Sequence, residues 1–105
     1  MSTLDLRSKL ADFLDYLAEY DESSNAYNRI LTTLESIIKT IVDTLSSNRN
    51  SYPDIKSNVD MLKEKMNDLV GYQLLKSYID KRFVYLDSVL NRASTRLIKS
   101  RELSF

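Results

Sequence analysis

The side chains that could do chemistry in this chain are carboxylates, tyrosines and basic residues, because it contains neither histidine nor cysteine. The chain therefore lacks the commonest general base, the thiolate nucleophile and the ligands that most transition-metal sites use. Its single glycine also leaves no glycine-rich loop that could hold a phosphate on backbone amides. We expect no enzyme activity, no catalytic residue and no cofactor.

Three carboxylates, Asp12, Asp15 and Glu19, have the spacing that places side chains on one face of a helix. Carboxylate oxygens are ligands that Mg²⁺ and Ca²⁺ prefer. The nearby segment Asp-Glu-Ser-Ser at 21–24, however, lacks the glycine and the oxygen spacing of a calcium loop. We interpret the three carboxylates as a solvated acidic face and predict no metal site.

The seven tyrosines could stack on nucleic-acid bases, but the formal net charge of zero provides no positive field to attract a nucleic acid. No nucleic-acid partner is therefore expected. Three tyrosines fall within the apolar pattern described below and are expected in the core: Tyr20, Tyr27 and Tyr72. Three more flank this pattern and are expected in the core or at a partner surface: Tyr16, Tyr78 and Tyr85.

A basic segment near the end, with Arg92, Arg96, Lys99 and Arg101, contains no acidic residue over 88–101. Such a segment could contact anionic lipid headgroups or an acidic partner, and it also suits the C-terminal end of a helix dipole. We rank a protein partner above membrane contact. No apolar run approaches the roughly 20 residues that span a bilayer, and the N-terminus lacks the layout of a secretory signal, which predicts a cytoplasmic protein.

Helices are expected to position these side chains, because apolar residues recur at alternating steps of three and four. From Leu6 to Leu45 the steps follow a heptad pattern over about six heptads, which places the residues on one stripe of a helix. A β-strand alternates with period two and cannot use this spacing. The pattern continues from Ile55 to Leu97 in the second half of the chain.

The clearest break in the pattern is the segment 46–53, which is rich in turn-forming residues and ends in Pro53. Proline suits the first turn of a new helix. The polar residues 21–25 also favour a turn over a helix interior. Either the helix passes through this segment, or it breaks into two helices over 3–20 and 24–46. The heptad phase is kept across the segment, so we favour one continuous or bent helix over 3–46.

The second helix is expected over 54–102 and contains a shift in the heptad phase. Leu69 and Ile79 are ten residues apart, which is a stammer, and Gly71 lies inside it. Glycine weakens a helix interior, so a kink or short break is predicted at 70–72. The sequence thus predicts a single all-α domain, built as a long antiparallel helical hairpin of the coiled-coil kind.

The apolar stripe is wider than the seam between two helices requires. Left exposed over such a length, it would promote aggregation. More than two helices are therefore expected to pack together, either by bending this chain into a three- or four-helix arrangement or by recruiting partner chains. The positions with the strongest signal form the predicted partner interface: Ile30, Leu34, Ile37, Ile38, Ile41, Leu45, Ile55, Val59, Leu62, Met66, Leu69, Ile79, Phe83, Leu86 and Leu90.

The helix at 34–45, the tip that ends in Tyr-Pro-Asp-Ile at 52–55, and the apolar residues at 59–62 together resemble a known family. This layout is similar to snapin and the snapin-like subunits of the complex for biogenesis of lysosome-related organelles. The chain departs from animal snapin in lacking the arginine cluster that follows the proline. The resemblance implies a non-catalytic subunit of a linear, multi-chain helical rod that works in endosomal sorting.

These observations predict a non-catalytic coiled-coil interaction subunit of a multi-protein complex in endosomal or lysosomal trafficking. The expected partners are other coiled-coil proteins in a hetero-oligomer, or further copies of this chain. Two alternatives stay open. One is a kinetochore or microtubule-associated coiled-coil subunit, which would show the same pattern. The other is a self-contained four-helix protein of the inhibitor or immunity type.

Overall fold

The computed structural model describes residues 3–21 and 27–103, which form four α-helices and one short 3-10 helix. In chain order the elements are α1 (Thr3–Glu19), α2 (Tyr27–Ser47), η1 (Arg49–Ser51), α3 (Tyr52–Met66) and α4 (Val70–Leu103). Within these two described ranges there is no β-strand. The predicted all-α class is confirmed, and the chain takes the four-helix form of it.

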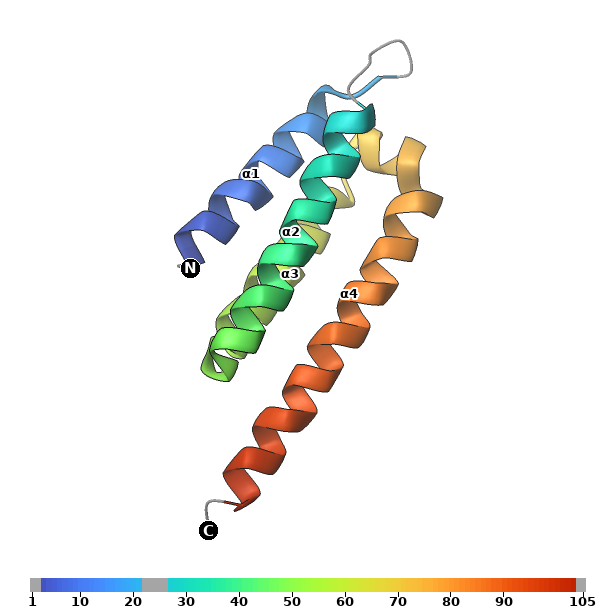
Figure 1. The fold of residues 1–105 in the computed structure, drawn as a ribbon. Coiled ribbons are helices and arrows are strands. Elements are labelled where there is room, and N and C mark those ends of the chain that lie inside the picture. The colour runs from blue at the N-terminus through green and yellow to red at the C-terminus, as the bar shows by residue number, and fades with distance from the viewer. Residues whose placement is uncertain (1–2, 22–26, 104–105) are drawn as a thin grey trace.

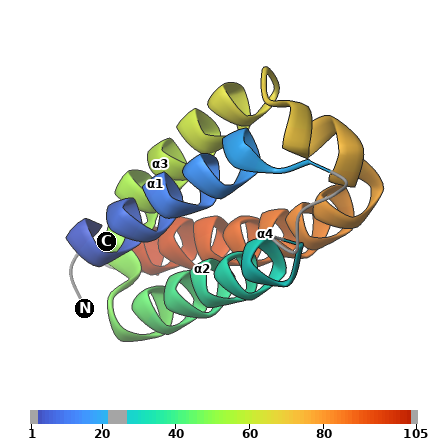
Figure 2. The same cartoon turned by 90° about the horizontal axis from the view of Figure 1, so that it is seen from above.

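The helices pack as an elongated bundle in which the chain direction alternates from each helix to the next (Figure 1). Seen from above, α1 lies beside α3 and α2 lies beside α4 (Figure 2). Of the six helix pairs, α2 and α3 contact each other least, because they occupy a diagonal of the bundle. The helix α4 is the longest, with 34 residues, and its C-terminal part extends past the end of α2 (Figure 1).

The chain reverses direction between α1 and α2. A bend is predicted at 21–25, and residues 22–25 of that segment lie outside the described residues. The continuous or bent helix predicted over 3–46 is wrong, because α1 ends at Glu19 and α2 runs back beside it. Each helix buries its own heptad positions, from Leu6 to Leu17 in α1 and from Leu34 to Leu45 in α2, whereas Tyr27 between them is exposed. A preserved phase therefore does not require a continuous helix.

The chain reverses again at 48–51, within the segment expected to form the tip. The side chain of Asn48 accepts a hydrogen bond from the backbone N–H of Asn50 at 3.1 Å and caps η1. Pro53 lies in the first turn of α3, where its missing N–H would have no helical partner. Asp54 in the same turn interacts favourably with the helix dipole.

The third interruption lies at 67–69, directly before the predicted position of 70–72. The single helix expected over 54–102 is thus divided into α3 and α4, which lie antiparallel. Gly71 falls in the first turn of α4. The chain therefore forms two helical pairs, α1 with α2 and α3 with α4, and the helices of each pair are neighbours in the sequence.

Gly71 allows a close approach between α4 and the C-terminal end of α1. A Cβ atom at this position would overlap the backbone carbonyl oxygen of Leu17 and would lie 3.0 Å from the Cβ of Tyr20. Real Cβ atoms do not tolerate an overlap with backbone, so only glycine fits here without a shift of a helix. Gly71, which would weaken a helix interior, thus lies where the pair α1–α2 contacts the pair α3–α4.

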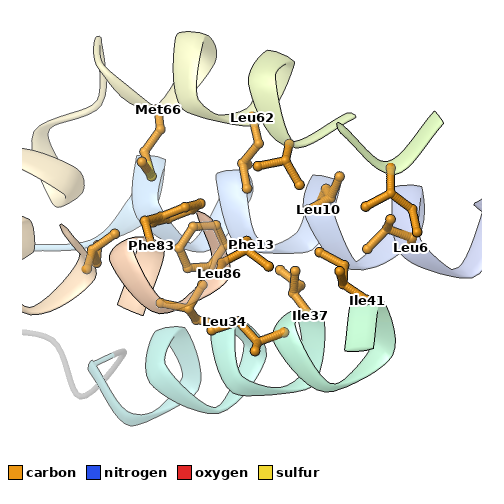
Figure 3. Close-up of a cluster of buried hydrophobic side chains, with 14 of the residues drawn as sticks. Leu6, Leu10, Phe13, Leu34, Ile37, Ile41, Leu62, Met66, Phe83 and Leu86 are labelled. Atoms are coloured by element: carbon orange, nitrogen blue, oxygen red, sulfur yellow. The ribbon is translucent and has the colours of Figure 1, made fainter. Parts of the chain in front are cut away.

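One hydrophobic core runs through the bundle and receives side chains from all four helices. Phe13 of α1, Ile37 of α2 and Leu86 of α4 are completely buried, and Leu62 of α3 nearly so. Figure 3 shows these side chains pointing toward one another from their helices. Most helical stability in proteins comes from packing of the apolar face, so this shared core stabilises the four helices.

Thr40 is the one buried residue outside the hydrophobic class among the residues whose burial the structure describes. Lys9 of α1 donates hydrogen bonds to Thr40 and to Ser36, both at 2.8 Å. The ammonium group thereby supplies the hydrogen-bond partner that a buried hydroxyl requires. This pair of bonds connects α1 to α2 beside the core.

Candidate interaction surface

The residues predicted as a partner interface lie inside the bundle. Fourteen of the fifteen are buried in the core that the chain forms by itself, and Leu69 is half-buried against it. The buried residues are Ile30, Leu34, Ile37, Ile38, Ile41, Leu45, Ile55, Val59, Leu62, Met66, Ile79, Phe83, Leu86 and Leu90. In this structure a partner could reach them only if the helices separated, so their contact with a partner stays a prediction.

The tyrosines expected in the core have different environments. Tyr72 is buried and Tyr20 packs half-buried against the core. Tyr27 is 40% exposed, so the prediction that it belongs to the core is wrong. The prediction counted heptads through 21–25 as one helix, whereas α2 begins at Tyr27 and buries Ile30 instead.

Exposed aromatic and apolar side chains form a strip along α4 where it lies beside α2. We call it the tyrosine strip and define it as Leu74, Tyr78, Arg82 and Tyr85 of α4 with Tyr27 of α2. The four α4 residues are spaced by four, four and three positions, which places them on one helix face. The three tyrosines and the leucine are 37% to 45% exposed. The strip therefore offers apolar surface that the bundle itself does not cover.

Contacts between α2 and α4 hold the strip in one arrangement. The rings of Tyr27 and Tyr78 meet edge to face with centroids 6.4 Å apart. Arg82 donates two hydrogen bonds to the carboxylate of Glu35, at 2.6 and 2.9 Å, and its guanidinium lies 5.2 Å from the ring centroid of Tyr85. The hydrogen bonds to Glu35 raise the pKa of Arg82 above its ordinary value. Side chains ordered in this way lose less entropy when a partner binds.

Tyr72 has a strongly perturbed hydroxyl. This hydroxyl donates a hydrogen bond of 2.6 Å to Asp80, two helical turns further along α4. The hydrogen bond, with burial and the negative charge of Asp80, raises the pKa of Tyr72 from 10.0 to about 12. The group is thus held as a neutral donor, which is a structural role and not that of a base.

The carboxylates considered for a metal site lie on the exposed face of α1: Asp12, Asp15 and Glu19. Over 3–21 and 27–103, no three acidic side chains are placed so that they could hold a metal ion. Arg92 and Arg96 of the basic segment lie on the surface of α4. Among the helices so described, none combines the length and the apolar character that crossing a bilayer requires.

The sequence contains only part of the signal for these surface features. The spacing of Leu74, Tyr78, Arg82 and Tyr85 is visible in it, although heptad counting treats such residues as flanking positions. The partners from α2 are not visible, because nothing local connects Glu35 to α4. A comparison of the chain with protein-family models, curated proteins and solved structures finds no match. A functional assignment must therefore come from the residues and contacts described above.

Proposed function

We propose that this chain is a non-catalytic interaction subunit of a multi-protein complex and that it binds a helical protein through the tyrosine strip. The observation that carries the proposal is the exposure of Tyr27, Tyr78 and Tyr85 around the ordered side chain of Arg82. Tyrosine and arginine are enriched among the residues that dominate binding energy. Both combine a large apolar surface with a hydrogen-bonding end, so they contribute to binding without making the free protein insoluble.

The form of the strip favours a partner helix. Anchors at steps of four, four and three on α4 match the repeat of a second helix lying along it. The neighbouring helix α2 contributes Tyr27 and Glu35 at the edge of the strip. The partner would thus pack on the outside of the bundle, and the buried heptad residues would keep their intramolecular role.

A role in endosomal or lysosomal trafficking is the finer part of the proposal. Its support is the resemblance of 34–45 and 52–55 to snapin-type chains, together with the expected cytoplasmic location. A kinetochore or microtubule-associated subunit would use the same kind of helical surface. The identity of the captured partner decides between them.

A second candidate is a self-contained four-helix protein that binds one target, as inhibitor or immunity proteins do. The observation that favours it is the burial of the predicted seam within the chain's own core. A chain that satisfies its apolar stripe by itself can fold without partner helices. The two candidates share the tyrosine strip and differ in the number and kind of proteins bound.

Affinity capture of the tagged full chain from its own cells, followed by mass spectrometry, tests the proposal. The strip variant carries Tyr78→Ser with Tyr85→Ser, and the control carries Met61→Ser at an exposed residue of α3. We expect several coiled-coil proteins in equal amounts with the wild type and the control, and their loss with the strip variant. With a purified partner, loss of a dominant anchor should weaken binding by about thirtyfold or more.

The other outcomes are equally informative. One globular protein captured in place of several helical ones would favour the inhibitor-type candidate. Equal capture by the strip variant and the wild type would overturn the tyrosine strip as the binding surface. Recovery of the chain alone would overturn the assignment as a complex subunit.

A further inference from the structure

Three arginines line one cavity between α2, η1 and α4. Arg49 comes from η1 at the tip of the bundle, and Arg92 and Arg96 lie one helical turn apart on α4. The cavity has a volume of about 420 Å³ and opens to solvent. The fold therefore brings together basic residues from two segments that are distant in the sequence.

The positive charge in this cavity is not compensated. In the part of the chain that the structure describes, Arg49, Arg92 and Arg96 form no ion pair, and the four ion pairs found there involve other residues. Asp43, the acidic residue of α2 that follows the lining residue Val42, lines a different hollow. Like charges one turn apart repel each other, so an anion bound here would relieve an unfavourable interaction.

The remaining walls of the cavity are largely apolar. Besides the arginines, the lining residues are Val42, Leu45 and Ser46 of α2 and Tyr85, Val89 and Ala93 of α4. A hydrated inorganic ion would gain nothing from such walls. A ligand with an anionic end and an apolar or aromatic body would gain from both parts.

We propose that this cavity is a binding site for a phosphate monoester, whose phosphate lies among the three arginines and whose organic part lies on the apolar walls. The planar guanidinium binds phosphate oxygens through two parallel hydrogen bonds. A monoester carries a charge of about −1.5 to −2 and three outer oxygens, so each arginine can find an acceptor. A carboxylate offers one charge and two oxygens, so it compensates less of the positive charge of the three arginines.

This site goes beyond the proposed function, because its ligand is a small anion and its three arginines lie outside the tyrosine strip; the two sites share only Tyr85. The phosphate monoester could belong to a soluble metabolite or to the headgroup of a lipid such as phosphatidic acid. Both sources present the same chemical group to the arginines. The experiment has one arm for each.

The first arm titrates the purified full chain with inorganic phosphate and with phenyl phosphate, followed by NMR chemical shifts. The cavity variant combines Arg49→Gln, Arg92→Gln and Arg96→Gln. The control removes the same charge from exposed positions elsewhere, by Arg29→Gln, Lys39→Gln and Lys81→Gln. We expect phenyl phosphate to bind more tightly than inorganic phosphate, and to bind the cavity variant at least about tenfold more weakly while the control is unchanged. Equal loss of binding in the cavity variant and the control would overturn the proposal.

The single variant Arg92→Lys keeps the charge but removes the guanidinium fork, and it guards against misfolding of the cavity variant. Binding of phenyl phosphate should again weaken by about tenfold if the fork holds the phosphate. Unchanged binding would show that general positive charge alone attracts the probe, and the site as proposed would not exist.

The second arm uses vesicles of phosphatidylcholine with and without phosphatidic acid. Co-sedimentation that requires both phosphatidic acid and the three arginines would identify the lipid headgroup as the source. Binding of phenyl phosphate without co-sedimentation would identify a soluble phosphate monoester. Failure of both probes would overturn the site, because nothing would then occupy the arginine cavity.

Discussion

Two adjacent residues at the start of α4, Gly71 and Tyr72, make contacts that depend on the size and polarity of a single side chain. Gly71 lies against the backbone of Leu17, and Tyr72 is buried with its hydroxyl bonded to Asp80. Hydrophobic periodicity predicts neither contact, because it identifies Gly71 only as a weak position of the helix and Tyr72 only as a core position. Substitutions at these positions therefore test the structure directly.

Replacing Gly71 by alanine should destabilise the protein by about 1–3 kcal/mol, because the added Cβ meets a backbone carbonyl that cannot rotate away. Helix propensity alone predicts the opposite sign, with a gain of about 1 kcal/mol. Chemical denaturation followed by circular dichroism measures the difference. The matched control is Val70→Ala, at the exposed preceding residue, which should be neutral or stabilising. A more stable Gly71→Ala variant would contradict the close approach of α1 and α4.

Tyr72→Phe should lower stability at neutral pH by about 1–2 kcal/mol, because it removes the hydrogen bond to a charged Asp80. The pKa of Tyr72 is raised from 10.0 to about 12, so the folded state holds this proton more tightly than the unfolded state. The contribution is fully present below pH 10 and is lost as the pH rises to about 12. The stability difference between wild type and Tyr72→Phe should shrink over that range.

Urea denaturation at a series of alkaline pH values measures this difference. Tyr78→Phe is the control, because the Tyr78 side chain is exposed on the tyrosine strip. A constant difference between wild type and Tyr72→Phe across the range would show that the hydroxyl of Tyr72 is not held by Asp80.

At the scale of the elements, α2 and α4 are joined by a small number of surface interactions outside the core. One of these is the ion pair between Arg82 and Glu35, which is joined by two hydrogen bonds. The guanidinium of Arg82 also lies over the ring of Tyr85. Both side chains of the ion pair are partly exposed, which limits the energy that the pair contributes. Its main effect is to fix the position of α4 along α2.

A double-mutant cycle with Glu35→Gln and Arg82→Gln should give a coupling energy of about 0.5–1 kcal/mol at low salt, decreasing at high salt. The control cycle uses Lys56 and Asp60, an exposed pair within α3, where about 0.3–0.5 kcal/mol is expected. If the coupling energy between Glu35 and Arg82 is no larger than that between Lys56 and Asp60, the second hydrogen bond of Arg82 adds no stability.

Sequence reasoning succeeded for the helices and for most buried positions because burial repeats with the period of a helix. It failed at 21–25, because α1 and α2 each repeat the heptad spacing and the match of phase between them does not show that the helix is continuous. It also could not place Leu17 beside Gly71, or Arg49 in one cavity with Arg92, because these residues lie far apart in the sequence. Periodicity describes which face of a helix is buried, and it contains no information on which helix covers that face.

At the scale of the whole molecule, the bundle differs in size from an open hairpin. The Cα atoms have a radius of gyration of 14.9 Å and extend over 57 × 24 × 19 Å. A hairpin of two helices of about 45 residues each would be about 67 Å long and two helices wide. The two arrangements bury different fractions of the same apolar stripe.

Small-angle X-ray scattering of the purified chain should therefore give a radius of gyration slightly above 14.9 Å, since side chains add to the Cα value. Sedimentation measured on the same sample should identify a monomer, because the core is complete within one chain. A longer particle, or a stable dimer, would show that the helices open and exchange partners in solution.

The contact between Leu17 and Gly71 also has a consequence for folding kinetics. The pairs α1–α2 and α3–α4 each join neighbours in sequence, so each can form rapidly after closing a short loop. The contact at Gly71 connects the two pairs and requires the closure of a much longer loop. Docking of the pairs at this point is therefore expected to come late in folding, and its loss is expected to come first when the bundle opens.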